Sequence, residues 1–277
     1  MLELGRRPLV MGVLNVTPDS FADAAPIVDP AAAADRALQL EAEGADLIDV
    51  GGESTRPGAE PVPLADELSR VLPVIRRLAR VLKVPLSVDT YKADVARAAV
   101  GEGAALVNDI SGLRYEPALG AVVAETGAAL VVMHTRGRPA TMHAEATYVD
   151  VVAEVAAELR ESILAAGRSG VPAERIIVDP GIGFAKRAEH SYGVLAGLPR
   201  LAAALDRPVL VGPSRKSFMR EGVGDRPPHE RDWGTAASVA AAVLGGAHIV
   251  RVHAVAEMVQ VVRVAEEIRK ALWHSAI

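Results

Sequence analysis

The sequence predicts an α/β fold: a single (β/α)8 barrel, one domain over residues 1–277, with long connections at the carboxyl ends of its strands. Short apolar runs alternate with Ala-rich helical stretches along the whole chain, as expected for βα units around a parallel sheet. No linker or shift in composition divides the chain. Half of the residues are hydrophobic but only 3% are aromatic, so small and branched aliphatic side chains must fill the core.

The strands are expected at eight apolar, β-branched runs: Leu9–Leu14, Leu47–Val50, Leu86–Val88, Leu106–Val107, Leu130–Met133, Ile176–Val178, Val209–Val211 and Ile249–Val252. Helical periodicity is clearest in five stretches between them: Pro30–Glu43, Leu64–Val81, Lys92–Glu102, Tyr148–Ala166 and Ala254–Leu272. Eight such units favour a closed barrel of roughly 250 residues. A doubly wound open sheet is the alternative fold.

A weak internal repeat supports the same interpretation. The dipeptide Gly-Ala occurs at residues 44–45, 103–104, 127–128 and 246–247, each time between a helical stretch and the next apolar run. A glycine at this place is typical of a residue that ends a helix in the left-handed conformation. The sequence therefore predicts that one type of helix-to-strand turn is used repeatedly around the fold.

The long connections follow strands and are expected to carry the function, because long ordered loops usually do. They are Asn15–Asp29, Gly51–Pro63, His134–Thr147 and Pro213–Arg231. All three phenylalanines of the chain, Phe21, Phe184 and Phe218, also lie in connections. Each could simply anchor its own loop. Together they suggest a mouth that closes over a flat ligand.

Composition excludes several classes of function. The formal net charge of −5 provides no basic field of the kind that attracts nucleic acid. The absence of cysteine excludes disulfides, thiol nucleophiles and thiolate metal sites, and is compatible with a reducing cytoplasm. The longest uncharged run, residues 233–250, is interrupted by Gly245-Gly246, so we expect no membrane span.

Polar residues stand at or just after nearly every predicted strand end. They are Asn15, the run Gly51 to Arg56, Asp89, Asn108-Asp109, His134, Asp179, Ser214-Arg215-Lys216, Arg251 and His253. Each residue alone has an ordinary explanation, such as a helix cap, an Asx turn or a solvated charge. In a barrel, however, these side chains converge on one rim. Their common position indicates a functional site.

The chemistry of this set suits a heterocycle and a phosphate. Asp179 can accept two N–H bonds from a guanidine-like edge, and Asn108 and Lys216 can complete the grip. Arg251 and His253 are donors suited to phosphate.

Asn15 offers an oxygen to a magnesium ion that bridges phosphates. The chain has no GxxxxGK[ST] loop and no strand-linked GxGxxG motif, and its histidine spacing does not resemble a zinc site. An ordinary nucleotide triphosphatase and a dinucleotide enzyme are therefore not indicated.

Seven longer motifs carry a family resemblance, in this order: Asn15-Val-Thr-Pro-Asp-Ser-Phe21, Gly51-Gly-Glu-Ser-Thr-Arg-Pro-Gly58, Ser87-Val-Asp-Thr90, Val107-Asn-Asp-Ile-Ser-Gly112, Asp179-Pro-Gly-Ile-Gly-Phe184, Ser214-Arg-Lys-Ser-Phe218 and Arg251-Val-His253. From about Leu9 to Val264 the sequence closely resembles the bacterial dihydropteroate synthases of the pterin-binding family.

The resemblance implies a barrel enzyme of folate synthesis that joins p-aminobenzoate to the methylene carbon of dihydropterin diphosphate and releases pyrophosphate, with Mg2+ assisting the leaving group. It also implies a cytoplasmic homodimer and a sulfonamide target. The implied pterin contacts are Asp89, Asn108, Asp179, Lys216 and Arg251. The implied diphosphate contacts are Asn15, Arg251 and His253, with Asn15 also at the metal, and the implied aminobenzoate contacts are Thr55, Arg56, Phe184 and Ser217. Asp89, Lys216, Arg251 and His253 would be the catalytic residues.

An SN1-like substitution is a mechanistic hypothesis that agrees with this transfer. Loss of diphosphate leaves positive charge on the methylene carbon, and the carboxylates of Asp89 and Asp179 would stabilise it. An arylamine then needs no strong base. At the start of a helix, Ser217 would meet the aminobenzoate carboxylate with backbone N–H groups and the helix dipole. The first two long loops would close over both substrates and exclude water.

Two departures from the family pattern concern phosphate handling and loop closure. The family usually has Asp after Arg-x-His, where this chain has Ala254, and Ser-Asp-Gly-Gly after the first-loop Phe, where it has Ala22-Asp23-Ala24-Ala25. The first change could alter the orientation or pKa of His253, and the second could stiffen the loop. Two other functions remain open at this stage: a methyltransferase that passes a methyl group from a reduced folate to a corrinoid protein, and a non-catalytic pterin-binding paralogue.

Overall fold

The computed structural model describes residues 4–17, 29–56 and 58–274, and in these the strands form one eight-stranded parallel sheet. The strands are β1 (Leu9–Asn15), β2 (Leu47–Gly51), β3 (Leu86–Asp89), β4 (Leu106–Asp109), β5 (Ala129–Met133), β6 (Ile176–Asp179), β7 (Leu210–Val211) and β8 (Ile249–Val252). Their order is β6-β5-β4-β3-β2-β1-β8-β7. A parallel bridge between Val178 and Val209 joins the two outer strands, so the sheet closes into a barrel and is not the open doubly wound alternative.

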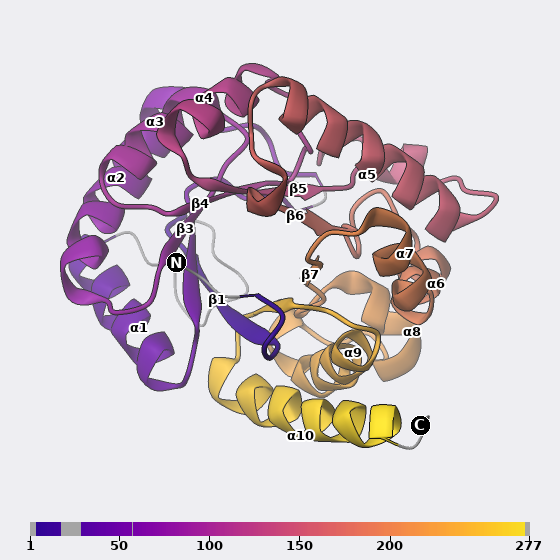
Figure 1. Cartoon of the computed structure of the whole chain (residues 1–277). Helices are drawn as coiled ribbons and strands as arrows, with labels where there is room; N and C mark the ends of the chain where they lie inside the picture. Colours follow the sequence, from indigo (N-terminus) through magenta and orange to yellow (C-terminus); the bar gives the residue numbers. More distant parts are fainter. Residues whose placement is uncertain (1–3, 18–28, 57, 275–277) are drawn as a thin grey trace.

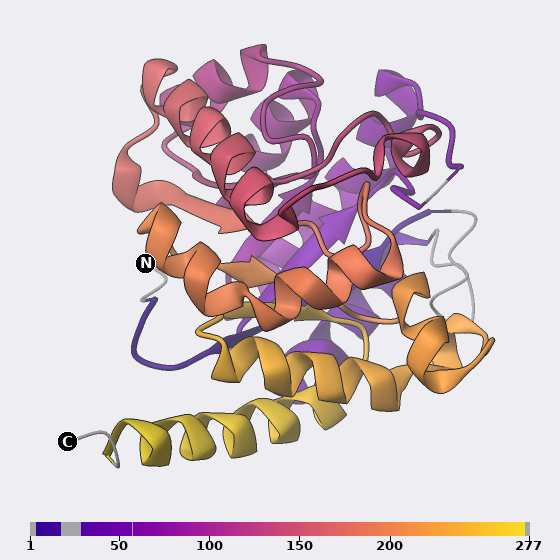
Figure 2. The same cartoon turned by 90° about the vertical axis from the view of Figure 1, so that its right-hand side faces the viewer.

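Helices form an outer ring around the strands (Figure 1), which Figure 2 shows from the side. They are α1 (Pro30–Ala42), α2 (Leu64–Val81), α3 (Ala93–Gly101), α4 (Ala118–Thr126), α5 (Val151–Arg168), α6 (Ala188–Ala196), α7 (Leu198–Leu205), α8 (Arg220–Val223), α9 (Asp232–Leu244) and α10 (Val255–His274). Among the described residues, no helix is both long and apolar enough to cross a membrane.

The predicted strands are all present, but five of them, β1, β2, β3, β4 and β6, end one or two residues later than their apolar runs. Asn15, Asp89, Asp109 and Asp179 are each the last residue of a strand. Sequence patterns stop at the first polar residue, whereas the backbone ladder continues for as long as the neighbouring strand pairs with it. The polar rim residues are therefore part of the sheet, which fixes their positions firmly.

The repeated glycine turn is confirmed. Gly44, Gly103, Gly127 and Gly246 all have positive φ, between 70° and 118°. After three of them, the next residue donates its N–H to a carbonyl five residues earlier, as in Ala45 to Leu40. This bond is typical of a helix that ends on a left-handed glycine.

The inside of the barrel is divided into an apolar layer and a polar layer. Eight buried side chains form the apolar layer: Leu9, Met11, Leu47, Leu106, Val131, Ile177, Leu210 and Ile249. Further along the same strands, towards their carboxyl ends, stand polar residues such as Asp49, Asn108 and Asp179. A larger apolar cluster packs the helices onto the outside of the strands. Polar groups therefore gather where the strands end.

Strand register places several of these residues at one level. Asn15 pairs with Gly51, Gly51 with Asp89, and Asp89 with Asn108 across four neighbouring strands. Paired residues of adjacent strands point to the same face of a sheet. The barrel thus presents an amide, a carboxylate and a second amide side by side, with a glycine leaving room between the first two.

Candidate active site

A cavity of about 510 Å³ opens at the carboxyl ends of the strands. Its lining includes Asn15, Thr55, Arg56, Asp89, Phe184, Ser214, Lys216, Ser217, Arg251 and His253. Most of the residues proposed from sequence therefore share one cavity. Asn108 and Asp179 do not belong to the lining, since each is buried beside it with 5% of its surface exposed.

Arg251 organises the floor of this cavity. Its Nε donates to Asp49 Oδ2 over 2.6 Å, and its Nη2 donates to Asp89 Oδ2 over 2.8 Å. Asn108 Nδ2 donates to the same oxygen of Asp49 over 3.0 Å. One guanidinium thus holds two carboxylates from neighbouring strands, and an amide completes the network.

Asp49 was missed by sequence reasoning, which assigned residues 47–50 to a core strand. It is fully buried, in the middle of β2. The available signal was its charge, because an aspartate inside an apolar strand is rarely buried without a cationic partner. Arg251 is that partner.

Two carboxylate oxygens at the floor of the cavity are left without a hydrogen-bond donor from the described residues. Among the described residues, Asp49 Oδ1 and Asp89 Oδ1 are buried and accept no hydrogen bond. Burial raises the pKa of Asp89 to about 7, although Arg251 opposes this rise. Buried polar atoms normally have partners. These two oxygens therefore suit a ligand that presents N–H donors.

Lys216 and Asp179 stand on the opposite side of the floor. Asp179 Oδ1 accepts the backbone N–H of Gly181 over 2.7 Å, and Lys216 Nζ donates to the carbonyl of Ile182 over 2.6 Å. Burial raises the pKa of Asp179 and lowers that of Lys216 to about 8, while each group's charge moderates the shift of the other. The two charges thus lie close enough to interact without a direct ion pair.

His253 is surrounded by cations. Burial, together with the nearby Arg215, Arg251, Arg56 and Lys216, lowers the pKa of His253 well below its usual value. A neutral imidazole among so many positive charges is typical of a site built for an anion.

Ser214 orients this imidazole. Its Oγ accepts the backbone N–H of His253 over 3.2 Å and lies 2.8 Å from His253 Nδ1. When the hydroxyl hydrogen bonds Nδ1, the proton of the neutral ring stands on Nε2. In that tautomer His253 is a neutral donor held by a serine.

The loop after β2 is tied back onto the barrel by Glu53. Its Oε2 accepts the backbone N–H of Val62 over 3.1 Å and pairs with Lys92 Nζ at 2.5 Å, while Oε1 accepts from the Tyr91 hydroxyl over 2.8 Å. The two ends of the loop are thus fixed by one carboxylate. Thr55 and Arg56 lie between them and line the cavity.

The three phenylalanines do not form one mouth. Phe184 lines the cavity, but Phe218 is buried and packs edge-on against Tyr192, with ring centroids 5.2 Å apart. For Phe218 the idea of a closing mouth was wrong, because its ring anchors its own loop in the helical core. Phe21 and the departure at residues 22–25 lie outside the described residues.

Ser217 begins a helix, as expected, but a very short one. A single 3₁₀ turn, Ser217–Met219, leads into the four residues of α8. A helix of this length has a small dipole. Backbone N–H groups and the side chain of Arg220, which also lines the cavity, are the better candidates for holding a carboxylate.

A magnesium ion fits this site only together with an anionic ligand. Among the described residues, no group of three or more His, Asp or Glu side chains could hold a metal ion. Asn15, which offers a neutral amide oxygen, lines the same cavity as His253. Phosphate oxygens and water would therefore have to supply most of the ligands.

Comparison with known proteins gives one consistent family. Residues 11–253 match the family model of the pterin binding enzymes. A dihydropteroate synthase of Synechocystis sp. is 46% identical over 273 residues, which cover 99% of this chain and 93% of the relative.

Solved structures agree. The Yersinia pestis dihydropteroate synthase in complex with a sulfonamide drug superimposes with a TM-score of 0.92 at 40% identity, over 98% of this chain and 96% of that one. The Xanthomonas albilineans enzyme with 4-aminobenzoic acid gives 0.88 at 44% identity, over 95% and 94%. The chain therefore belongs to the pterin-binding enzyme family and, within it, to the dihydropteroate synthases, transferases of folate biosynthesis.

Proposed function

We propose that the chain condenses p-aminobenzoate with (7,8-dihydropterin-6-yl)methyl diphosphate, giving 7,8-dihydropteroate and pyrophosphate by an SN1-like substitution. One observation carries the proposal: a single cavity joins the buried carboxylate of Asp89 to a cluster of cations around His253. The first half suits a donor-rich heterocycle, and the second suits a diphosphate. A substrate that contains both would span the cavity.

The pterin ring would lie against Asp179, Asn108 and Lys216. The Asp179 carboxylate would accept two N–H bonds from the aminopyrimidine edge, and Lys216 would donate to the ring carbonyl. Asp89, whose Oδ1 accepts no bond from the described residues, would face the reduced ring. Arg251 would stack against the ring from its place between the two floor carboxylates.

The diphosphate would be held by Arg251, His253 and Asn15. The Nε2–H of a neutral His253 can donate to a phosphate oxygen without being protonated first. Bound Mg2+ would neutralise charge on the leaving pyrophosphate, with Asn15 as its protein ligand.

Departure of pyrophosphate would leave positive charge delocalised over the methylene carbon and the dihydropterin. The carboxylates of Asp89 and Asp179 would face the ring and stabilise that charge. The arylamine nitrogen is then a sufficient nucleophile, so we assign no general base.

The arylamine would enter beside Phe184, with Thr55, Arg56 and Ser217 around it. The Xanthomonas albilineans relative is described with 4-aminobenzoic acid, which supports a subsite of this chemistry. Loop closure over both substrates would exclude water, which would otherwise trap the cation.

The test is pyrophosphate release from the dihydropterin diphosphate with Mg2+, measured with and without p-aminobenzoate. We expect release that depends on the arylamine and falls when Mg2+ is chelated. A methyltransferase of the same fold would show pterin binding that is indifferent to p-aminobenzoate, and a non-catalytic paralogue would bind the pterin without release. Either pattern from folded protein would refute the proposal.

The cytoplasmic location and the homodimer are also proposed, on the strength of the family alone. Size-exclusion chromatography with light scattering checks the dimer.

A further inference from the structure

Lys186 is a buried lysine that the proposed chemistry does not use. Only 2% of its surface is exposed, and it does not line the cavity. Its ammonium group makes no ion pair within the described residues. Nζ instead bonds two neutral acceptors, His134 Nδ1 at 2.8 Å and the carbonyl oxygen of Phe184 at 3.1 Å. Burying a lysine in this way is costly, so its position calls for a reason.

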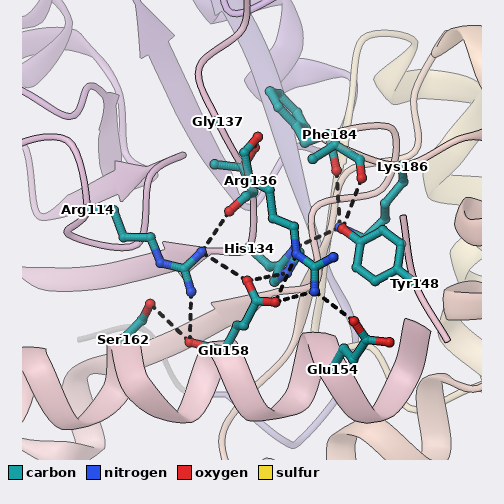
Figure 3. Close-up of polar contacts among 12 residues, drawn as sticks. Arg114, His134, Arg136, Gly137, Tyr148, Glu154, Glu158, Ser162, Phe184 and Lys186 are labelled. Carbon is teal, nitrogen blue, oxygen red and sulfur yellow. Dashed lines mark hydrogen bonds and ion pairs between the residues drawn. The ribbon is translucent and has the colours of Figure 1, made fainter. Parts of the chain in front are cut away.

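The nearby carboxylates are occupied by other partners. Figure 3 shows Glu158 and Glu154 rising from α5 towards Arg136, with Lys186 on the other side of His134. Arg136 Nη2 lies 2.5 Å from Glu158 and 2.9 Å from Glu154. The cluster therefore balances its own charges, and Lys186 makes its contacts as a hydrogen-bond donor.

The protonation states agree with this role. Burial lowers the pKa of His134 to about 3, so its ring is neutral and Nδ1 can accept while Nε2 lies 3.2 Å from Glu158. Burial also lowers the pKa of Lys186 to about 7, with Asp179 opposing this shift and Lys216 adding to it. A neutral amine still has two N–H bonds, one for each of its two acceptors.

The backbone that Lys186 holds is a strained turn. Ala185 has φ of +47°, a left-handed conformation that is unfavourable for a residue other than glycine. Gly181 is pressed against the end of β5, since a Cβ there would lie 1.9 Å from the carbonyl oxygen of His134. The Tyr148 hydroxyl donates to the carbonyl of Ala185 over 2.9 Å. The Tyr148 side chain, from outside the turn, thus helps to hold it in place.

Phe184 is the residue of this turn that lines the cavity, and two lysines hold it from opposite sides. From the cavity side, Lys216 bonds the carbonyl of Ile182 and lies 4.4 Å from the centre of the Phe184 ring. From the core side, Lys186 bonds the carbonyl of Phe184 itself. Both lysines thus bond backbone carbonyls of the turn that carries the ring.

We propose that Lys186 is a positioning residue for the arylamine subsite: through the Phe184 carbonyl it fixes the ring that forms one wall of that subsite. The identity of the ligand as an arylamine rests on the proposed function. The contact between Lys186 and the Phe184 carbonyl does not. Lys186 itself touches neither substrate.

The kinetic test replaces Lys186 by methionine, which keeps the length of the side chain and removes its donors. We expect the KM for p-aminobenzoate to rise about tenfold, because the wall of the subsite loses roughly one hydrogen bond. The kcat and the KM for the pterin diphosphate should stay within about twofold of the wild-type values. Lys186→Gln is a second, polar variant for the case in which the methionine variant folds poorly. Its side chain is shorter than that of lysine, so we again expect the KM for p-aminobenzoate to rise.

The matched control is Arg114→Met. Arg114 belongs to the same cluster, bonding the carbonyl of Thr135 and Glu158, but it makes no bond to the strained turn. We expect a loss of thermal stability and an unchanged KM for p-aminobenzoate. Equal rises of both KM values in the Lys186 variants, or the same p-aminobenzoate effect in the control, would overturn the proposal and leave Lys186 a structural residue.

A second readout does not depend on activity. The chain has three phenylalanines, so 4-fluorophenylalanine labelling should give three ¹⁹F signals, and Phe184→Leu identifies one of them. We expect that signal to move or broaden in Lys186→Met and to stay in place in Arg114→Met. If it stays in place in both, Lys186 does not position the ring, whether or not the wild-type chain couples the proposed substrates.

Discussion

Asp179→Asn is expected to weaken binding of the pterin diphosphate about 1,000-fold, because two charge-assisted hydrogen bonds to the ring edge are lost and an amide N–H is turned towards ring donors. The fold should survive. Asparagine can still accept the backbone N–H of Gly181, and burial already disfavours the charged form of Asp179. Isothermal titration with the pterin diphosphate, without arylamine, measures the affinity.

Asp109→Asn is the matched control for this change. Asp109 also ends a strand and is fully buried, but both of its carboxylate oxygens accept backbone N–H groups, Oδ1 that of Ser111 and Oδ2 that of Leu113, so neither is left for a ring edge. Its replacement should leave pterin affinity unchanged. Equal losses in the two variants, or wild-type affinity in Asp179→Asn, would show that the grip is assigned to the wrong residue.

Arg251→Met is expected to abolish activity and to lower the free energy of unfolding by about 3–5 kcal/mol, because two buried carboxylates lose their cation. The loss should grow with pH. Burial raises the folded pKa of Asp89 from 3.8 to about 7 while Arg251 opposes this rise, so without Arg251 the folded pKa is higher still. A carboxyl with a raised folded pKa loses stability as pH rises through that range. Urea unfolding of the wild type and the variant at pH 6 and pH 9 measures the loss in free energy of unfolding and its dependence on pH.

A second substitution separates stability from chemistry. Adding Asp49→Asn to Arg251→Met removes one of the two uncompensated charges and should restore much of the stability, without restoring activity. The ion pair of Arg76 and Glu102 supplies the control. Because this pair is exposed to water, which screens its charges, Arg76→Met should change the free energy of unfolding little. A stable, active Arg251→Met variant would contradict the role given to this floor network.

Sequence was sufficient for the barrel because its signal is carried by repetition. Eight apolar runs alternate with helices, and the glycines that end the helices recur, so an error in one unit does not change the fold. The strand ends were placed too early because polar residues such as Asp89 and Asp179 continue the ladder beyond the apolar run. Periodicity reports burial, and it cannot report where hydrogen bonding between backbones stops.

The site could be predicted only where residues stand at strand ends. Asp49 lies inside a strand, and its role depends on Arg251, which is 202 positions away in the sequence. Ser214 and Lys186 act through bonds whose direction depends on the fold. Phe218 shows the opposite error, since a loop aromatic was read as part of the mouth although it packs inside. Contacts between distant elements are what the linear sequence does not display.

The most direct test of the central claim is a crystal structure of the protein with 7,8-dihydropteroate bound. We expect the pterin ring to lie against Asp179, Asn108 and Lys216, with the arylamine portion beside Phe184 and its carboxylate near Ser217. A product molecule bound outside the cavity, or a ring that makes no contact with Asp179, would contradict it.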